Sequence, residues 1–146
     1  MKNKNLIYII AIVAVLFVLN SCKKEDNSSN SSSSSNISNI VQQGKWKVTL
    51  YKDNGTDETY YFSSHEFLFN STGTITASLN SNNSNGTWSS ITDDSSLKLV
   101  IDFGTSLPLN KLNNDWHIIE QTSTFIRLED VSGGNGSVDY LNFQKI

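Results

Sequence analysis

The sequence predicts an all-β fold, an up-and-down antiparallel β-barrel of about eight strands, over residues 40–146. From residue 40 onward, apolar and polar residues alternate with a period of two, which is typical of strands that bury one face. Turn-forming residues recur every eight to twelve positions. No stretch in this region carries a convincing helical period, so the class is all-β rather than mixed.

The predicted strands follow one another with short breaks. In KWKVTLY (45–51), Trp46, Val48 and Leu50 fall on one face, and lysine and threonine side chains fall on the other. GTITASL (73–79) and SLKLVIDF (96–103) alternate in the same way. Shorter strands are predicted at 60–62, 67–69, 86–89, 116–120, 125–129 and 138–143.

The breaks contain residues suited to turns. Asn54-Gly55 favours positive φ and suits a tight hairpin. Pro108 excludes a central strand from the irregular connection at 104–113, where a single helical turn would fit. Further turns or loops are predicted at 71–73, 85–86, 93–94, 113–114 and 132–137.

Barrel closure is predicted from the number of strands. An open sheet of this size would leave two long edges with unpaired backbone groups, and closure removes them. A two-sheet β-sandwich is the alternative architecture.

The N-terminal part predicts export and a tether. Two lysines precede fourteen uncharged residues at 6–19, too short for the roughly 20 apolar residues of a membrane span and suited to a signal peptide. The segment is therefore predicted to be a signal peptide, which is removed from the mature protein. Residues 27–36 are all Ser or Asn and have no apolar surface to bury, so 22–39 is predicted to be a flexible tether.

Leu19-Asn20-Ser21-Cys22 resembles a bacterial lipobox. The resemblance implies removal of residues 1–21 by cleavage before Cys22, diacylation of the Cys22 thiol and acylation of the new amino terminus. Two or three acyl chains hold a protein stably at a membrane. The charged run at 23–26 resembles a signal for surface display in Gram-negative lipoproteins, so the expected location is the outer membrane, at the cell surface or the periplasmic face.

The barrel region resembles the lipocalin-like domains of bacterial lipoproteins. GKWKV (44–48) opens with Gly-x-Trp, and FLFNSTGTITA (67–77), NGTWS (85–89), LPLNKLNNDWHI (107–118), FIRLED (125–130) and LNFQK (141–145) follow in the family's order. The resemblance implies an eight-stranded calycin-type barrel with an interior ligand site. In typical lipocalins an arginine near the end of the barrel packs across the first tryptophan. This sequence departs from that pattern, because its only arginine, Arg127, alternates with apolar neighbours and is expected to point away from the lumen.

A barrel of eight strands can either be filled by side chains or hold one small ligand. The predicted inward residues supply the candidate ligand-binding side chains Trp46, Phe67, Phe69, Trp88, Phe103 and Trp116. A filled interior is the alternative, since a small domain needs its aromatic residues for a core. The other residues predicted to point inward are Val48, Leu50, Ile75, Ala77, Leu79, Leu97, Leu99, Ile101, Ile118, Ile126, Leu128, Leu141 and Phe143.

Composition and motifs argue against several other functions. From Cys22 onward there are nine basic and fourteen acidic side chains, a balance of −5, which does not suit nucleic-acid binding. His65 and His117 have no metal-binding spacing, and the single cysteine excludes an internal disulfide. The carboxylate pairs 57–58, 93–94 and 129–130 are expected to be solvated at turns. No catalytic residue, metal or cofactor is therefore predicted.

The sequence thus predicts a monomeric, membrane-anchored, lipocalin-like lipoprotein. Its expected function is non-enzymatic binding of a small apolar or amphipathic ligand in or at the mouth of the barrel. The alternative is a surface interaction module with a filled barrel, whose loops 52–58 and 132–137 contact another macromolecule.

Overall fold

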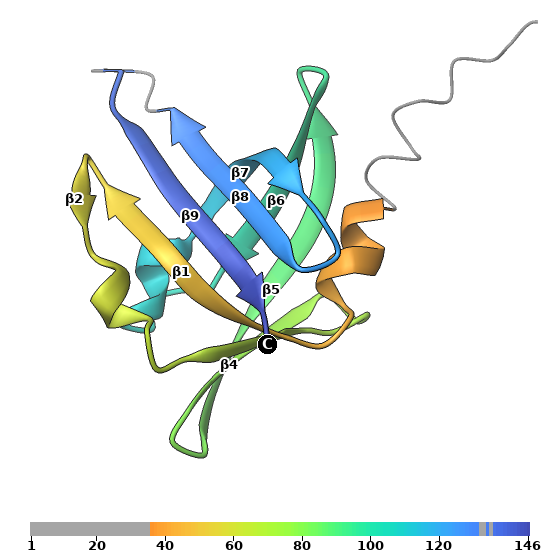
Figure 1. The fold of residues 1–146 in the computed structure, drawn as a ribbon, viewed down its shortest axis with the longest axis vertical. Coiled ribbons are helices and arrows are strands. Elements are labelled where there is room, and N and C mark those ends of the chain that lie inside the picture. Colours follow the sequence, from red (N-terminus) through yellow and green to blue (C-terminus); the bar gives the residue numbers. More distant parts are fainter. Residues whose placement is uncertain (1–35, 132–133, 135) are drawn as a thin grey trace, which may run out of the picture.

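The computed structural model describes residues 36–131, 134 and 136–146, in which nine strands form one antiparallel sheet (Figure 1). The predicted signal peptide, Cys22 and the tether as far as residue 35 lie outside the described residues. The strands are β1 (Lys45–Asp53), β2 (Thr56–Asp57), β3 (Glu66–Phe69), β4 (Thr74–Leu79), β5 (Asn82–Asp93), β6 (Ser96–Asp102), β7 (Asn114–Gln121), β8 (Phe125–Val131) and β9 (Val138–Lys145).

The sheet closes on itself through its first and last long strands. From β3 to β9 each strand pairs with the next along the chain, β9 pairs with β1, and β1 pairs with β3. The β1–β9 register runs from Trp46 opposite Lys145 to Lys52 opposite Tyr140. This confirms the predicted up-and-down barrel of eight strands, with β2 as an extra strand at the end of β1.

The interior follows the predicted alternation in most strands. Of the residues predicted to point inward, all but Leu50, Leu79, Leu97 and Ile118 are buried, and Leu97 and Ile118 still pack against the core. The core also contains residues that the alternation does not include: Ile37, Val41, Tyr51, Phe62, Leu109 and Leu112.

Leu50 is half-buried on the outer face, so its predicted inward position is wrong. The β1–β9 register shifts between Val48 and Leu50, a β-bulge at which the side-chain alternation changes parity. Tyr51 consequently takes the inward position and is only 4% exposed. A second register shift lies between Ile118 and Glu120 in β7.

Two further predictions are corrected. The strand predicted at 60–62 is a 3₁₀ helix, η2 (Thr59–Tyr61), because the amides of Tyr61 and Phe62 donate to carbonyls three residues earlier. The turn predicted at 85–86 lies inside β5. The β4–β5 reversal occurs earlier, at Asn80 and Ser81, which both have positive φ.

The remaining connections agree better with the sequence. Asn54 and Gly55 both have positive φ, as a tight hairpin requires. Asp94 and Ser95 make the β5–β6 turn in the same conformation. The connection at 104–113, where a single helical turn fits the sequence, contains a second 3₁₀ helix, η3 (Leu109–Leu112).

A short helix over residues 36–41 precedes the barrel (Figure 1). Ile37 and Val41, one turn apart on this helix, are fully buried in the core. The Ser38 hydroxyl lies 2.8 Å from that of Ser90 on β5 and ties the helix to the barrel wall. The packed unit therefore includes residues 36–39, which the sequence assigns to the tether.

Gly86 occupies a position in β5 where Asp102 and Phe103 leave little space for a side chain. A Cβ at this position would lie 2.8 Å from the Phe103 ring and would also press on the Asp102 carbonyl. We expect Gly86→Ala to destabilise the fold by about 1–3 kcal/mol, because the packed neighbours must shift. Denaturant unfolding measures this as a lower midpoint at unchanged slope.

Gly134→Ala is the matched control, since a Cβ there meets no atom within 4 Å. Its unfolding free energy should stay within about 0.5 kcal/mol of the wild type. Equal midpoints for the two variants would contradict the crowding at Gly86.

Candidate functional site

The six candidate ligand-binding aromatics all lie inside the barrel. Trp46 comes from β1, Phe67 and Phe69 from β3, Trp88 from β5 and Trp116 from β7, while Phe103 follows β6. Their exposed fractions range from 0% to 7%. The alternation of apolar residues places them there, as the sequence predicts.

The phenylalanine rings pack against one another in edge-to-face geometry. Phe143 on β9 lies between the two β3 rings, with centroid distances of 5.5 Å to Phe67 and 5.7 Å to Phe69. Phe69 also contacts Trp88 at 5.6 Å, and Phe67 contacts Phe103 at 6.4 Å. Each of these contacts contributes stability beyond that of area burial alone, on the order of 0.5–1.5 kcal/mol.

All three indole N–H groups donate to backbone carbonyls. Trp46 Nε1 donates to Val41 at 2.8 Å, Trp88 Nε1 to Asn70 at 2.9 Å, and Trp116 Nε1 to Leu112 at 2.9 Å. These acceptors belong to the helix at 36–41, the turn before β4, and η3. The interior tryptophans therefore hold the connecting segments against the barrel while satisfying their own polar atoms.

Tyr51, which points inward because of the bulge in β1, also ties a connecting segment to the barrel. Its hydroxyl donates to the Lys111 carbonyl at 2.8 Å, and its ring contacts Phe62 and Trp116. Burial, reinforced by nearby carboxylates, raises the pKa of Tyr51 far above its usual value, so the hydroxyl remains a donor.

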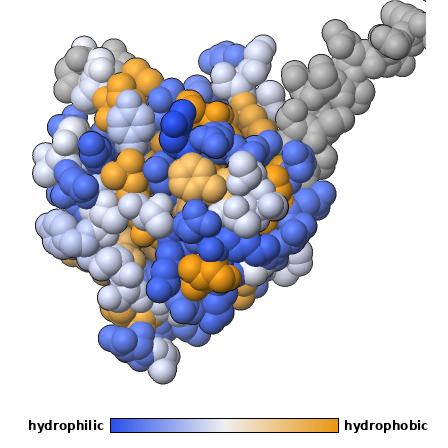
Figure 2. Space-filling view, viewed as in Figure 1, coloured by the Kyte–Doolittle hydropathy of each residue, from blue (hydrophilic) through white to orange (hydrophobic). Residues whose placement is uncertain are grey.

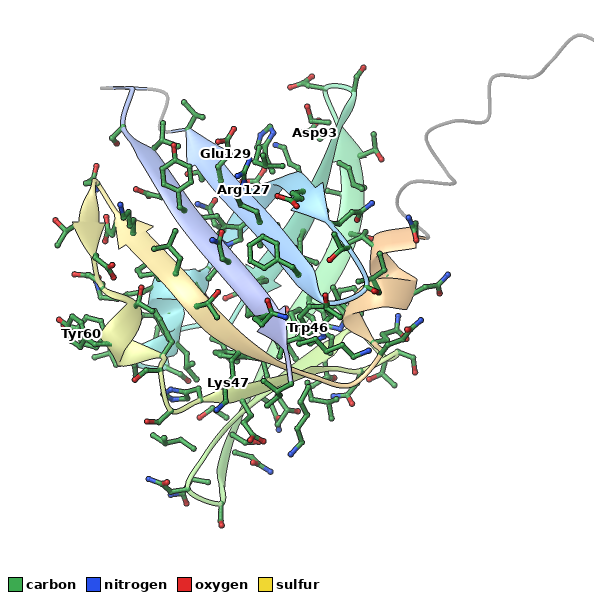
Figure 3. The ribbon with its side chains drawn as sticks, in the orientation of Figure 1. Trp46, Lys47, Tyr60, Asp93, Arg127 and Glu129 are labelled. Atoms are coloured by element: carbon green, nitrogen blue, oxygen red, sulfur yellow. The ribbon has the colours of Figure 1, made fainter. Side chains whose placement is uncertain are left out.

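Two grooves lined by described residues lie on the outer face of the barrel. The β1–β9–β8 groove has a volume of about 440 Å³ and faces the viewer in Figure 3, where Arg127 and Glu129 lie close together on β8. Figure 2 shows that this face mixes hydrophilic and hydrophobic side chains. Its lining residues are Leu50, Lys52, Arg127, Glu129, Tyr140 and Asn142.

The second groove, the β3–β5 groove, has a volume of about 460 Å³ and an almost entirely polar lining. Its two charges neutralise each other, since Lys45 Nζ lies 2.8 Å from Glu66 Oε2 and lowers the pKa of that carboxyl. The lining residues are Lys45, Ser64, Glu66, Ser78, Asn80, Ser81 and Asn83.

Two other lysines are held by carboxylates. Lys98 on β6 lies 2.7 Å from Asp115 and 3.1 Å from Asp93, and hydrogen bonds with both raise the pKa of Lys98. Lys111 lies 2.7 Å from Glu58 and 3.7 Å from Asp53, which raises its pKa, principally through the hydrogen bond with Glu58. These cations cross-link neighbouring elements.

Arg127 and Lys52 contrast with these lysines. Arg127 is exposed, as the sequence predicts, and among the described residues no carboxylate forms an ion pair with Arg127 or Lys52. Sequence reasoning did not assign the groove around them. Its lining residues share a face only because of the β1 bulge, which alternation does not reveal.

The described residues hold no cluster of three or more His, Cys, Asp or Glu side chains suited to a metal ion. His117 is half-buried on β7, opposite Glu129. No helix within the described ranges has the length and apolar character needed to span a membrane.

No protein-family model matches the chain, and no curated protein matches it. The fold is similar to the crystal structure of a DUF4847 family protein from Bacteroides vulgatus ATCC 8482, with 15% identity and a TM-score of 0.48 over 75% of this chain and 97% of that one. It is also similar to an uncharacterized protein from Bacteroides eggerthii DSM 20697, with 16% identity and a TM-score of 0.44 over 72% of this chain and 99% of the other.

His65 is a buried titratable group between η2 and β3. It is 7% exposed, its Nδ1 has no hydrogen-bond partner among the described residues, and its ring lies near those of Phe62 and Phe67. Burial lowers the pKa of His65 below its ordinary value of 6.5, opposed in part by a hydrogen bond with the Tyr61 backbone.

This pKa shift predicts a loss of stability in mild acid. The contribution of neutral His65 is complete above pH 6.5 and is lost as the pH falls through the lower folded-state pKa. The loss is at most about 1.4 kcal/mol per pH unit. We expect His65→Gln to lose less unfolding free energy than the wild type between pH 7.5 and 5, measured by denaturant titration. Identical losses would show that His65 does not contribute.

Proposed function

We propose that this chain is a lipid-anchored, non-enzymatic binding module that acts through the outer surface of its barrel. In this proposal the interior is a structural core rather than a ligand site. The protein acts as a monomer, is held by lipid on Cys22 at the outer membrane of a Gram-negative bacterium, and faces the cell surface or the periplasm.

The observation that supports this proposal is the packing of the interior aromatics. The phenylalanine rings contact one another edge to face, and the three indole N–H groups donate to backbone carbonyls of the connecting segments. A ligand that displaced these rings would break core contacts and leave buried polar groups unpaired, at a cost of about 1–3 kcal/mol for each unpaired group. The outer grooves can be occupied at no such cost.

Lipocalin-like binding of a small apolar or amphipathic ligand is the second candidate. Besides the family resemblance, it is favoured by Trp88 and Phe103, which retain 7% and 3% exposure, whereas the other four candidate aromatics are at most 1% exposed. A ligand that enters the interior would contact the exposed parts of these two rings first.

A fluorescence titration distinguishes the two candidates. We expect long-chain fatty acids to leave the tryptophan emission of residues 22–146 unchanged when Cys22→Ala keeps the chain unlipidated, because binding inside would have to break the ring contacts and the indole hydrogen bonds. A fatty-acid-binding barrel serves as the positive control. A saturable change in emission, reduced by Trp88→Phe, would instead favour binding at the barrel mouth.

The anchor is tested in a Gram-negative host that expresses the full chain. We expect the wild type to take up labelled fatty acid and to sediment with membranes, because two or three acyl chains bind stably. Cys22→Ala should lose the label and leave the membrane fraction, whereas Ser21→Ala, which keeps a small residue before the cysteine, should retain both properties. Labelling of Cys22→Ala would place the lipid elsewhere.

A further inference from the structure

We propose that the β1–β9–β8 groove binds a ligand in which a carboxylate lies next to a hydrogen-bond donor. Amino acids, hydroxy acids and the free C terminus of a peptide all carry this chemistry. The inference rests on the proposed function to the extent that both place binding on the outer surface.

The strand register builds the groove from two rows of side chains. Leu50, Asn142 and Arg127 are aligned across β1, β9 and β8, and Lys52, Tyr140 and Glu129 form the next row. Rows two residues apart along a strand lie about 6.5–7 Å apart, the span of a small organic acid. The bulge before Leu50 brings the β1 members of the two rows, Leu50 and Lys52, onto the outer face.

The charged side chains of the groove leave a surplus of positive charge. Its two cations, Lys52 and Arg127, face one lining carboxylate, Glu129, and neither cation forms an ion pair with a described residue. Outside the lining, Asp57 is opposite Lys52 on β2 and Glu120 is opposite Arg127 on β7, but neither carboxylate forms an ion pair with the cation that it faces. Arg127 is the only arginine in the sequence, and its planar fork suits a bidentate carboxylate.

Asn142 supplies the second recognition element at the centre of the first row. Its Oδ1 is excluded from solvent and accepts no hydrogen bond from a described residue. Such an atom needs a donor, because a buried acceptor without a partner is costly. Asn142 lines the groove, so a rotation of its side chain would let an amide, ammonium or hydroxyl group next to a carboxylate held by Arg127 donate to Oδ1.

Leu50 and Tyr140 provide the apolar surface for the rest of the ligand. Both are half-buried and occupy opposite rows of the groove. The β3–β5 groove lacks this combination, since its single lysine and single carboxylate already pair at 2.8 Å. Two cations that form no ion pair with a described residue, a buried acceptor without a partner and apolar side chains together distinguish the β1–β9–β8 groove.

The test is an NMR titration of ¹⁵N-labelled residues 22–146 carrying Cys22→Ala. The probes are N-acetyl-Gly-Gly-Leu with a free carboxylate, the same peptide as its C-terminal amide, L-leucine and L-lactate. We expect the free peptide to shift the backbone amides of residues 50–52, 127–129 and 140–142. The amide form should bind at least tenfold more weakly, because it lacks the charge that Arg127 pairs with.

Arg127→Gln should weaken binding of the free peptide at least tenfold, and its amide spectrum shows whether the fold is kept. Lys47→Gln is the matched control, because Lys47 also lies on β1 and forms no ion pair among the described residues, but it does not line the groove (Figure 3). Its affinity should equal that of the parent chain.

The probes also identify the source of the carboxylate. Binding of the peptide alone assigns the groove to chain ends, and comparable binding of leucine or lactate assigns it to free acids; either result supports the proposal. Binding weaker than about 10 mM for every acid, or undiminished by Arg127→Gln, would overturn it. A fatty-acid response of the tryptophans would instead overturn the proposed function, so the two failures are distinguishable.

Discussion

The antiparallel pairing of β1 with β9 is the interaction on which the rest of the molecule depends. It joins the two ends of the sheet and removes the edges that an open sheet of this size would expose. It also contains the bulge between Val48 and Leu50. That single irregularity turns Tyr51 inward, where its hydroxyl reaches the Lys111 carbonyl, and turns Leu50 outward into the β1–β9–β8 groove. The same pair of strands therefore closes the barrel and shapes a groove on its surface.

Closure of the barrel explains why the polar atoms of the buried aromatic side chains form hydrogen bonds with the connecting segments. A barrel of eight strands is narrow enough for side chains to fill, and its ends must then be covered by chain that carries its own backbone groups. The three indoles and Tyr51 donate to carbonyls of the helix at 36–41, the turn before β4, and η3. Each aromatic thus buries a large apolar ring and satisfies a carbonyl in one placement.

Alternation in the sequence was sufficient to predict the barrel and most of its inward residues, because one buried face per strand leaves a period of two. Alternation gave a wrong prediction where local hydrogen bonds between nearby residues replace the hydrogen bonds between strands. The segment at 60–62 alternates like a strand but forms i→i+3 bonds, and Asn85-Gly86 has turn composition but lies in a long strand, where Phe103 leaves no space for a larger residue. Ile37 was hidden in a polar tract, because one apolar side chain gives no periodic signal.

The outer groove could not be predicted for a related reason. Its six residues come from three strands that are distant in sequence, and a one-residue shift in register exchanges the two faces of a strand. The parity change at the bulge decides whether Tyr51, or Leu50 together with Lys52, lies on the surface beside Arg127. A ligand inside the barrel would have to break the contacts that hold the interior aromatics. On the outer face, Lys52 and Arg127 form no ion pair with a described residue, and Asn142 Oδ1 accepts no hydrogen bond from one. These outer groups are therefore the better guide to where a ligand binds. If the interior of this barrel serves as a core, as we propose, its function is to be sought where outer polar atoms of the described residues lack partners.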